Sequence, residues 1–84
     1  MAEIEVYTTR VCPYCHRAKA LLQRKGAAYK EIDVSDDADL RMSLIEKSGG
    51  QRTVPQIFIN GQHIGGSDDL HKLDAEGKLD KLLK

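Results

Sequence analysis

The sequence predicts an α/β domain built on a four-stranded mixed sheet with helices on both faces. Three observations support this prediction. Short apolar runs alternate with segments of helical periodicity, one two-residue sequence strongly favours a β-hairpin turn, and two cysteines lie beside a predicted strand–helix–strand unit. The chain has 84 residues, so we expect one domain over residues 1–84. Apolar residues make up 40% of the sequence and charged residues 31%, which is typical of a soluble globular protein.

The first part of the chain predicts a parallel strand–helix–strand unit. Residues 3–8 alternate in polarity and are rich in β-forming side chains, so they predict a strand. Pro13 suits the first turn of a helix, where its missing N–H has no partner, and Gly26 ends that helix. Residues 28–34 predict the second strand. The short connections favour a right-handed parallel crossover.

A second helix is predicted after this unit. Ser and Asp side chains at residues 35–37 can cap its N-terminus. Leu40, Leu44 and Ile45 form its predicted apolar face, and the glycine pair at 49–50 ends it.

A hairpin and a third helix complete the predicted order β-α-β-α-β-β-α. Gln56–Ile59 is a short apolar run that predicts a strand. Asn60–Gly61 is the strongest two-residue hairpin sequence, so residues 62–64 should return antiparallel. Ser67 is expected to cap the third helix, and residues 79–83 should form a final turn.

Charge and cysteine content restrict the function and the compartment. The formal net charge is zero, which argues against a general nucleic-acid binder. The first residues carry no basic region and no long apolar run, so we expect neither a secretory signal nor a membrane segment. Two cysteines three positions apart in a reducing compartment are catalytic or metal-binding rather than structural. We therefore expect a cytoplasmic protein.

The two cysteines, Cys12 and Cys15, flank Pro13 and Tyr14 at the predicted start of the first helix. Residues three apart on a helix share a face, so this pair can close a disulfide. Cys12 lies where first-turn N–H groups are unpaired, the helix dipole is positive and residues 6–30 carry six Lys or Arg and no acid. These features favour a thiolate, so we predict Cys12 as the nucleophile and Cys15 as a shielded resolving thiol.

Two other roles for the cysteines need weighing. They could form half of a zinc site, but the other two cysteines are absent, and His16, His63 and His71 are scattered over what we predict to be solvated surfaces. They could be inert core residues, but a proline-marked helix start within a basic stretch favours a reactive pair. A C-x-x-C beside a strand–helix–strand unit is typical of the thioredoxin-like class.

Two further motifs could bind a thiol-bearing ligand. Pro55 precedes a strand, and an ordinary strand-entry proline is the simpler interpretation. A cis bond would instead leave the Val54 backbone free to pair with an extended peptide. The glycines at 65–66 and the Ser67 cap expose N–H groups that can hold a carboxylate, and Asp68 could accept from an ammonium. A zwitterionic amino-acid end would match both charges, although a plain capped turn has the same sequence.

Together these motifs resemble those of the glutaredoxins, specifically the short bacterial dithiol type. The match covers nearly the whole chain and runs through Cys12–Cys15, Thr53–Ile59, Asn60–Gly61 and Gly65–Asp69. Three separated motifs in the right order are highly specific, whereas C-x-x-C alone is not. The resemblance implies a thioredoxin fold, a cis Pro55, and glutathione as the reductant, with no metal expected.

The resemblance also implies a glutathione groove. Tyr14 would lie beside the sulfur, the backbone of Thr53 and Val54 would pair with the cysteinyl residue, and the start of the third helix would hold the γ-glutamyl end. Relatives often carry a lysine where this chain has Thr9, so Arg10 or Arg41 is the expected cation for the glycyl carboxylate, and Arg52 could contribute. The implied binding residues are Arg10, Tyr14, Arg41, Thr53, Val54, Pro55, Gly66, Ser67 and Asp68.

The implied activity is reduction of protein disulfides and glutathione mixed disulfides, with ribonucleotide reductase among the family-type partners. A monomer is the default expectation for a chain of this size. Thr9 in place of lysine keeps open a donor recharged by a thioredoxin reductase. A carrier in which two chains bridge an iron–sulfur cluster is the alternative from a different class. Pro13 and Cys15 argue against it, because relatives specialised for that task usually lack the second cysteine.

Overall fold

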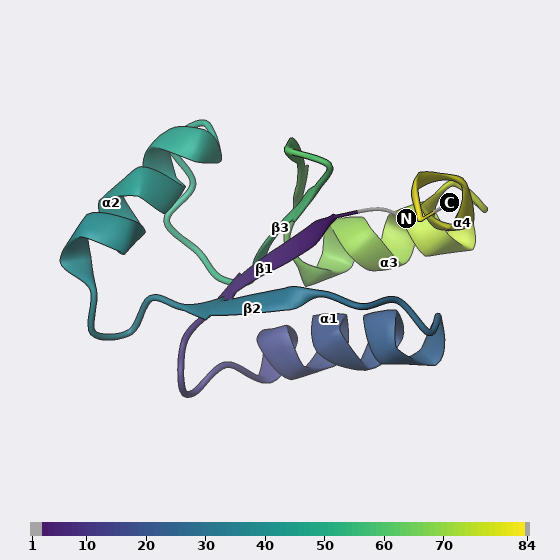
Figure 1. Ribbon diagram of the computed structural model, residues 1–84, viewed down its shortest axis with the longest axis horizontal. Helices are drawn as coiled ribbons and strands as arrows, with labels where there is room; N and C mark the ends of the chain where they lie inside the picture. Colours follow the sequence, from purple (N-terminus) through teal and green to yellow (C-terminus); the bar gives the residue numbers. More distant parts are fainter. Residues whose placement is uncertain (1–2, 84) are drawn as a thin grey trace.

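The computed structural model describes residues 3–83, so residues 1–2 and 84 of the predicted domain lie outside the described part. The elements in chain order are β1 (Ile4–Thr8), α1 (Pro13–Arg24), β2 (Lys30–Asp33), α2 (Ala38–Lys47), β3 (Gln56–Ile59), β4 (Gln62–Gly65), α3 (Ser67–Ala75) and α4 (Leu79–Leu82). This is the predicted order, with the expected final turn forming α4 (Figure 1).

The four strands form one mixed sheet in the order β2-β1-β3-β4. β1 pairs with β2 in parallel, while β3 pairs antiparallel with both β1 and β4. Asn60 and Gly61 join β3 to β4 with φ values of 53° and 81°, the left-handed conformations that a tight two-residue hairpin requires. The predicted parallel unit and the predicted hairpin are both confirmed.

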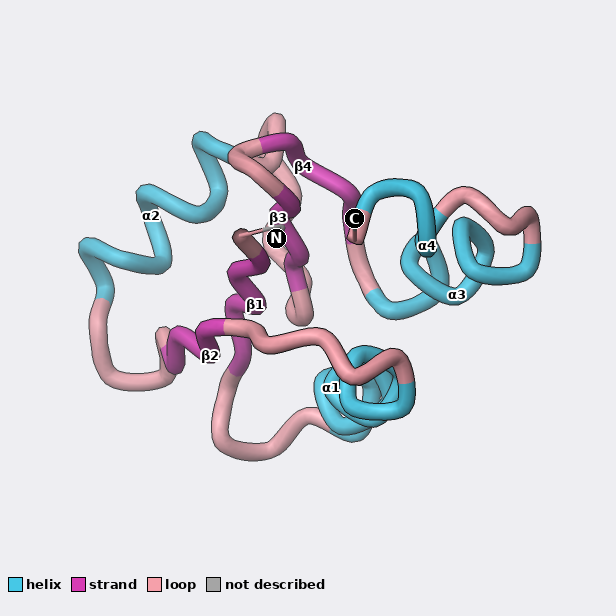
Figure 2. The backbone as a smooth tube through the Cα atoms, turned by 45° about the vertical axis from the view of Figure 1, so that its right-hand side comes forward, coloured by secondary structure: helices cyan, strands magenta, loops and turns pink. Residues whose placement is uncertain are grey.

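Helices cover both faces of the sheet (Figure 2). α2 lies on one face, whereas α1, α3 and α4 lie on the other. Because side chains alternate along a strand, β1 contributes to both cores. The larger core contains Ile4, Val6, Ala18, Leu21, Leu22, Ile57, Ile59, Leu70 and Leu79. The smaller core, on the α2 side, contains Tyr7, Val34, Leu44 and Phe58.

The predicted apolar face of α2 is only partly correct. Leu44 is buried in the smaller core and Ile45 is half-buried, but Leu40 is 38% exposed. The helix contributes only Leu44 to the buried cluster, so the residue one turn earlier lies beyond the packed surface. The predicted N-cap is confirmed at Asp37, whose carboxylate accepts from the Leu40 N–H at 3.0 Å.

Candidate active site

Cys12 and Cys15 lie at the N-terminus of α1, as predicted. Cys12 is the N-cap, and its Sγ accepts a hydrogen bond from the Cys15 N–H at 3.2 Å. Both thiols are free, and both residues are buried, with 7% of Cys12 and 2% of Cys15 exposed. A hydrogen bond from a first-turn N–H is stronger to a charged acceptor, so this geometry stabilises negative charge on the Cys12 sulfur.

Cys15 is held in its protonated form. Burial raises the pKa of the Cys15 thiol to about 12, and both a hydrogen bond to Cys12 and the charge of Cys12 act in the same direction. A backbone hydrogen bond from Thr9 and the ammonium of Lys19 act in the opposite direction. Cys15 is therefore the shielded thiol of the pair.

This asymmetry predicts selective alkylation of the reduced protein. Iodoacetamide reacts with thiolates, so a thiol with a pKa of about 12 should react slowly at pH 7.5. We expect Cys12 to be modified first and Cys15 to stay largely unmodified, with Cys15 labelling rising as the pH is raised. Mass spectrometry of the digested protein measures both sites, and equal labelling at pH 7.5 would contradict the assignment.

Acidic side chains pair with two of the basic residues near the cysteines, so the positive charge there is lower than the sequence suggested. Arg10 forms an ion pair with Asp36. Lys19 lies 3.0 Å from the Glu31 carboxylate, which also accepts from the Thr8 hydroxyl at 3.0 Å. The Lys19 ammonium lowers the pKa of Glu31, so this pair is charged on both sides. The backbone N–H of the helix start is thus the direct stabiliser of the Cys12 sulfur.

A cleft of about 300 Å³ lies beside the cysteines, between the start of α1, the loop before β3 and the start of α3. It is lined by Tyr14, Gln51, Thr53, Val54, Pro55, Gly66, Ser67, Asp68 and Asp69. Seven of the nine predicted binding residues meet here, and the exceptions are Arg10 and Arg41. Cys12 Sγ lies 3.6 Å from the Val54 carbonyl, which joins the reactive sulfur to the cleft wall.

The Val54–Pro55 peptide bond is cis. The resemblance to the glutaredoxins implied this geometry, whereas the residues alone favoured an ordinary strand-entry proline. Pro55 itself is buried, immediately before β3.

The start of α3 differs from the prediction, because Ser67 is not the cap. Gly66 is the N-cap, and the Asp69 carboxylate accepts from the Gly66 N–H at 3.1 Å. Ser67 is the first helical residue, 4% exposed, and its Oγ is buried without a hydrogen-bond partner among the described residues. A buried hydroxyl without a partner at the wall of a cleft is available to a ligand.

Two lining residues, Gln51 and Asp69, were missed by the sequence analysis. Asp69 follows Gly66 by three positions, which is the spacing of a capping box, so this pattern could have identified it. Gln51 lies in an irregular loop after two glycines, where no periodicity marks a side chain as facing a cleft.

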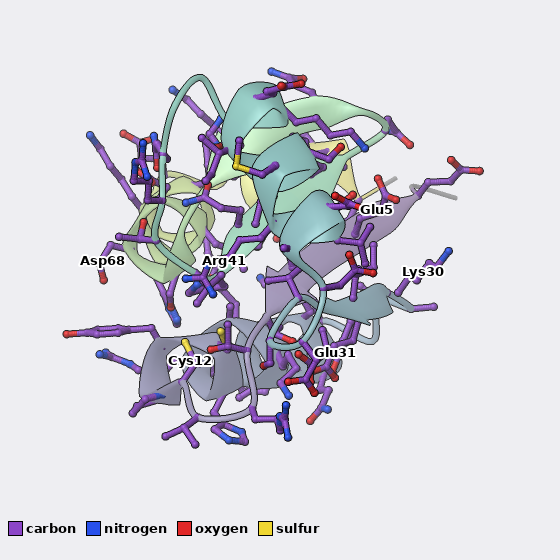
Figure 3. The ribbon with its side chains drawn as sticks, turned by 90° about the vertical axis from the view of Figure 1, so that its left-hand side faces the viewer. Glu5, Cys12, Lys30, Glu31, Arg41 and Asp68 are labelled. Carbon is purple, nitrogen blue, oxygen red and sulfur yellow. The ribbon has the colours of Figure 1, made fainter. Side chains whose placement is uncertain are left out.

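Arg41 and Arg10 occupy different surroundings. In Figure 3, Arg41 of α2 is seen above Cys12 and to the right of Asp68, on the same side of the molecule. Arg10 instead pairs with Asp36 in the loop that precedes α2. Arg52, the further candidate cation, is exposed and does not line the cleft.

The histidines are less exposed than expected. The prediction of solvated surfaces holds for His16 but is wrong for His63 and His71, which are half-buried. His63 Nε2 lies 2.7 Å from Gln56 Oε1, because β4 places its ring against the sheet.

Within residues 3–83, no group of three or more Cys, His, Asp or Glu side chains is arranged to hold a metal. In the same part of the chain, every helix is too short or too polar to cross a membrane.

Comparison with known proteins gives the family. The glutaredoxin family model matches residues 4–64. The chain is also 57% identical to Glutaredoxin 3 of Escherichia coli K12 over 84 residues, covering all of both chains. The chain belongs to the glutaredoxin family. A third match, at 50% identity over 82 residues, is a probable glutaredoxin of Synechocystis, with 98% of this chain and 93% of that protein covered.

Solved structures confirm the thioredoxin fold of this glutaredoxin. The glutaredoxin of Brucella melitensis matches with a TM-score of 0.88 and 56% identity, covering 100% of this chain and 90% of that one. Buckwheat glutaredoxin in complex with glutathione matches with a TM-score of 0.89 and 36% identity, covering 98% and 76%. As a member of the family, this glutaredoxin is an enzyme, a glutathione-dependent thiol–disulfide oxidoreductase. The two alternatives weighed from the sequence are not favoured.

Proposed function

We propose that this glutaredoxin removes glutathione from mixed disulfides through Cys12. The Cys12 thiolate attacks the glutathionyl sulfur, the S–S bond breaks, and the substrate sulfur leaves as a thiolate that takes up a proton. A second glutathione then attacks the glutathionyl sulfur on Cys12, which forms glutathione disulfide and restores the Cys12 thiolate. The observation that supports this cycle most directly is the Cys15 N–H bound to Cys12 Sγ at 3.2 Å beside the cleft.

We assign Cys15 to the reduction of protein disulfides. In that reaction the Cys12 thiolate breaks the substrate disulfide, which releases one thiol and leaves the other half joined to Cys12. Cys15 then attacks the Cys12 sulfur, which releases the second thiol and forms a Cys12–Cys15 disulfide that glutathione reduces. Two of the causes that raise the Cys15 pKa come from Cys12, its hydrogen bond and its charge. Both are lost once the Cys12 sulfur is in a disulfide, so the resolving thiol becomes easier to deprotonate at the step that needs it.

The γ-glutamyl end of glutathione fits the start of α3. Its carboxylate would accept from the N–H groups of Ser67 and Asp68 and from the Ser67 hydroxyl, which is buried and has no partner among the described residues. Its ammonium would bind the Asp68 carboxylate at the rim of the cleft. Thr53 and Val54, on the opposite wall, would pair with the cysteinyl backbone, next to Pro55 and Tyr14.

For the glycyl carboxylate we favour Arg41 over Arg10. Arg10 already forms an ion pair with Asp36, so binding a second carboxylate would compete with that contact. Arg41 lies on α2 and is seen on the same side of the molecule as Cys12 and Asp68 (Figure 3). Arginine suits this role because its guanidinium can bind a carboxylate through two parallel hydrogen bonds.

The choice between the two arginines is testable by neutralising each. We expect Arg41→Gln to raise the KM for a glutathione mixed disulfide by about fivefold, because one charge-assisted but solvent-exposed contact is lost. Arg10→Gln should raise it less than twofold. Arg24→Gln, at the far end of α1, is the control for loss of a positive charge. A larger effect in Arg10→Gln than in Arg41→Gln would reverse the assignment.

The activity itself is tested by turnover of a small glutathione mixed disulfide with glutathione, glutathione reductase and NADPH. We expect saturable dependence on the mixed disulfide and loss of the rate when glutathione is omitted. Turnover with thioredoxin reductase and NADPH, but not with glutathione, would instead favour the donor recharged by that reductase.

We further propose that the chain acts as one domain and as a monomer in the cytoplasm, where glutathione keeps thiols reduced. Its protein substrates would be glutathionylated or disulfide-containing proteins, with ribonucleotide reductase among the candidates. The neutral net charge and two cysteines support a soluble redox protein rather than a nucleic-acid-binding or membrane-associated one.

A further inference from the structure

One wall of the cleft, residues 51–55, lies outside any helix or strand, between α2 and β3. Side-chain hydrogen bonds therefore contribute to its shape, and the amide nitrogen of Gln56 contacts three acceptors in this loop. The Gln56 Nε2 atom lies 3.0 Å from the Thr53 carbonyl oxygen, 3.3 Å from Thr53 Oγ1 and 3.1 Å from Gln51 Oε1. Gln56 is fully buried and does not line the cleft.

The partners fix the orientation of the Gln56 amide. Its NH₂ group faces two carbonyl-type oxygens and a hydroxyl, all of which can accept. The Oε1 atom then faces His63 Nε2 at 2.7 Å, so His63 must donate from Nε2. The neutral Nε2–H tautomer and the imidazolium both provide that donor.

His63 is itself held by the sheet. It lies on β4 opposite Phe58 of β3, and the two rings have centroids 5.1 Å apart. A continuous series of hydrogen bonds thus runs from His63 through Gln56 to the Thr53 carbonyl, from the sheet to the wall of the cleft.

The hydrogen bonds from His63 through Gln56 to Thr53 also fix the direction of the Val54 N–H. The peptide bond between Thr53 and Val54 is trans, and in a planar trans peptide the C=O and the N–H point in opposite directions. The Thr53 C=O is directed at the buried Gln56 amide. The Val54 N–H is therefore directed away from the Thr53 carbonyl and from Gln56, and Val54 itself lines the cleft.

We infer that Gln56, anchored by His63, is a positioning residue that aims the Val54 N–H at the backbone of the bound peptide thiol. The inference rests on the proposed binding of glutathione along Thr53 and Val54. Gln56 needs no contact with the ligand, because it acts through the Thr53–Val54 peptide plane. A side chain that only filled the core would not couple specifically to ligands that pair with this backbone.

The test replaces the donor while keeping the size of the side chain. Gln56→Glu still accepts from His63 but cannot donate to the Thr53 carbonyl in its ionised form. We expect the KM for a glutathione mixed disulfide to rise about tenfold with kcat within about twofold. Alkylation of Cys12 by iodoacetamide, which uses no backbone pairing, should keep its rate. Gln62→Glu, an exposed change of the same kind on β4, is the matched control and should behave as wild type.

A second pair of variants tests the anchor and does not require Gln56→Glu to fold. His63→Phe can still pack against Phe58 but cannot donate to Gln56, so we expect the KM to rise about threefold. His63→Gln retains a donor and should bring the KM back toward wild type. Circular dichroism identifies any variant that is unfolded.

The outcomes separate this inference from the proposed function. Wild-type KM in folded Gln56→Glu, or in His63→Phe if Gln56→Glu is unfolded, would overturn the positioning role. An equal loss of Cys12 alkylation would also overturn it, because it would indicate general damage. If the wild-type protein shows no glutathione-dependent turnover, the proposed function fails first and this inference fails with it.

Discussion

Replacing Cys12 with serine is expected to reduce glutathione-dependent turnover to the uncatalysed background. In the proposed cycle the attacking group is the Cys12 sulfur at the start of α1, and a serine hydroxyl in the same place cannot form a disulfide. Cys15→Ser should keep turnover of the small mixed disulfide near the wild-type rate, because a second glutathione resolves Cys12. The same variant should lose the reduction of protein disulfides that requires both thiols.

These expectations are measured with two substrates and three proteins. The glutathione reductase assay follows the mixed disulfide, and reduction of a disulfide-containing protein follows the dithiol route. The Cys12 N-cap hydrogen bond comes from the backbone N–H of Cys15, so Cys15→Ser leaves that donor in place. Equal and complete loss in both variants, with both substrates, would exclude the assigned roles.

The elements of the fold were predictable because each has a local chemical cause. Pro13 and the capping side chain of Asp37 mark two helix starts, and Asn60–Gly61 sets the hairpin. The extent of packing was not predictable in the same way. Leu40 has the right spacing for an apolar face, but only the position of α2 on the sheet decides that Leu44 alone is buried.

In the candidate site, too, residues with a local sequence signal were predictable and residues brought together by the fold were not. The cysteine pair follows from sequence because C-x-x-C at a helix start has its own chemistry. The resemblance supplied the cis Pro55 and the groove, which the residues alone left open. Gln56 was assigned only to a strand, because its partners Thr53 and His63 are brought to it by the loop and by β4. Contacts of this kind depend on tertiary structure and leave no periodic pattern.

Gly65→Ala is expected to be among the most damaging single changes near the cleft. Gly65 ends β4 with φ of +125°, a conformation that side chains rarely adopt. A Cβ atom there would overlap the Asp69 carboxylate, lying 2.8 Å from its Cγ. Because Asp69 accepts from the Gly66 N–H, the new methyl group would displace the side chain that caps α3.

We expect Gly65→Ala to lower the free energy of unfolding by about 2–4 kcal/mol, from backbone strain of about 1–3 kcal/mol and loss of a cap of about 1 kcal/mol. Gly77→Ala is the matched control, because Gly77 also has a positive φ of +74°, but a Cβ atom added there would meet no other atom within 4 Å. It should show only the strain of a left-handed residue, without the overlap with Asp69. Urea unfolding measures both, and similar losses would mean that Asp69 moves aside without cost.

The same substitution links the stability of α3 to ligand binding. The first turn of α3 supplies Gly66, Ser67 and Asp68 to the cleft, so displacement of Asp69 should disturb all three. We expect Gly65→Ala to raise the KM for the glutathione mixed disulfide more than about tenfold under conditions where it stays folded, while Gly77→Ala leaves it unchanged. A destabilised Gly65→Ala protein with wild-type KM would show that the start of α3 does not bind the γ-glutamyl end.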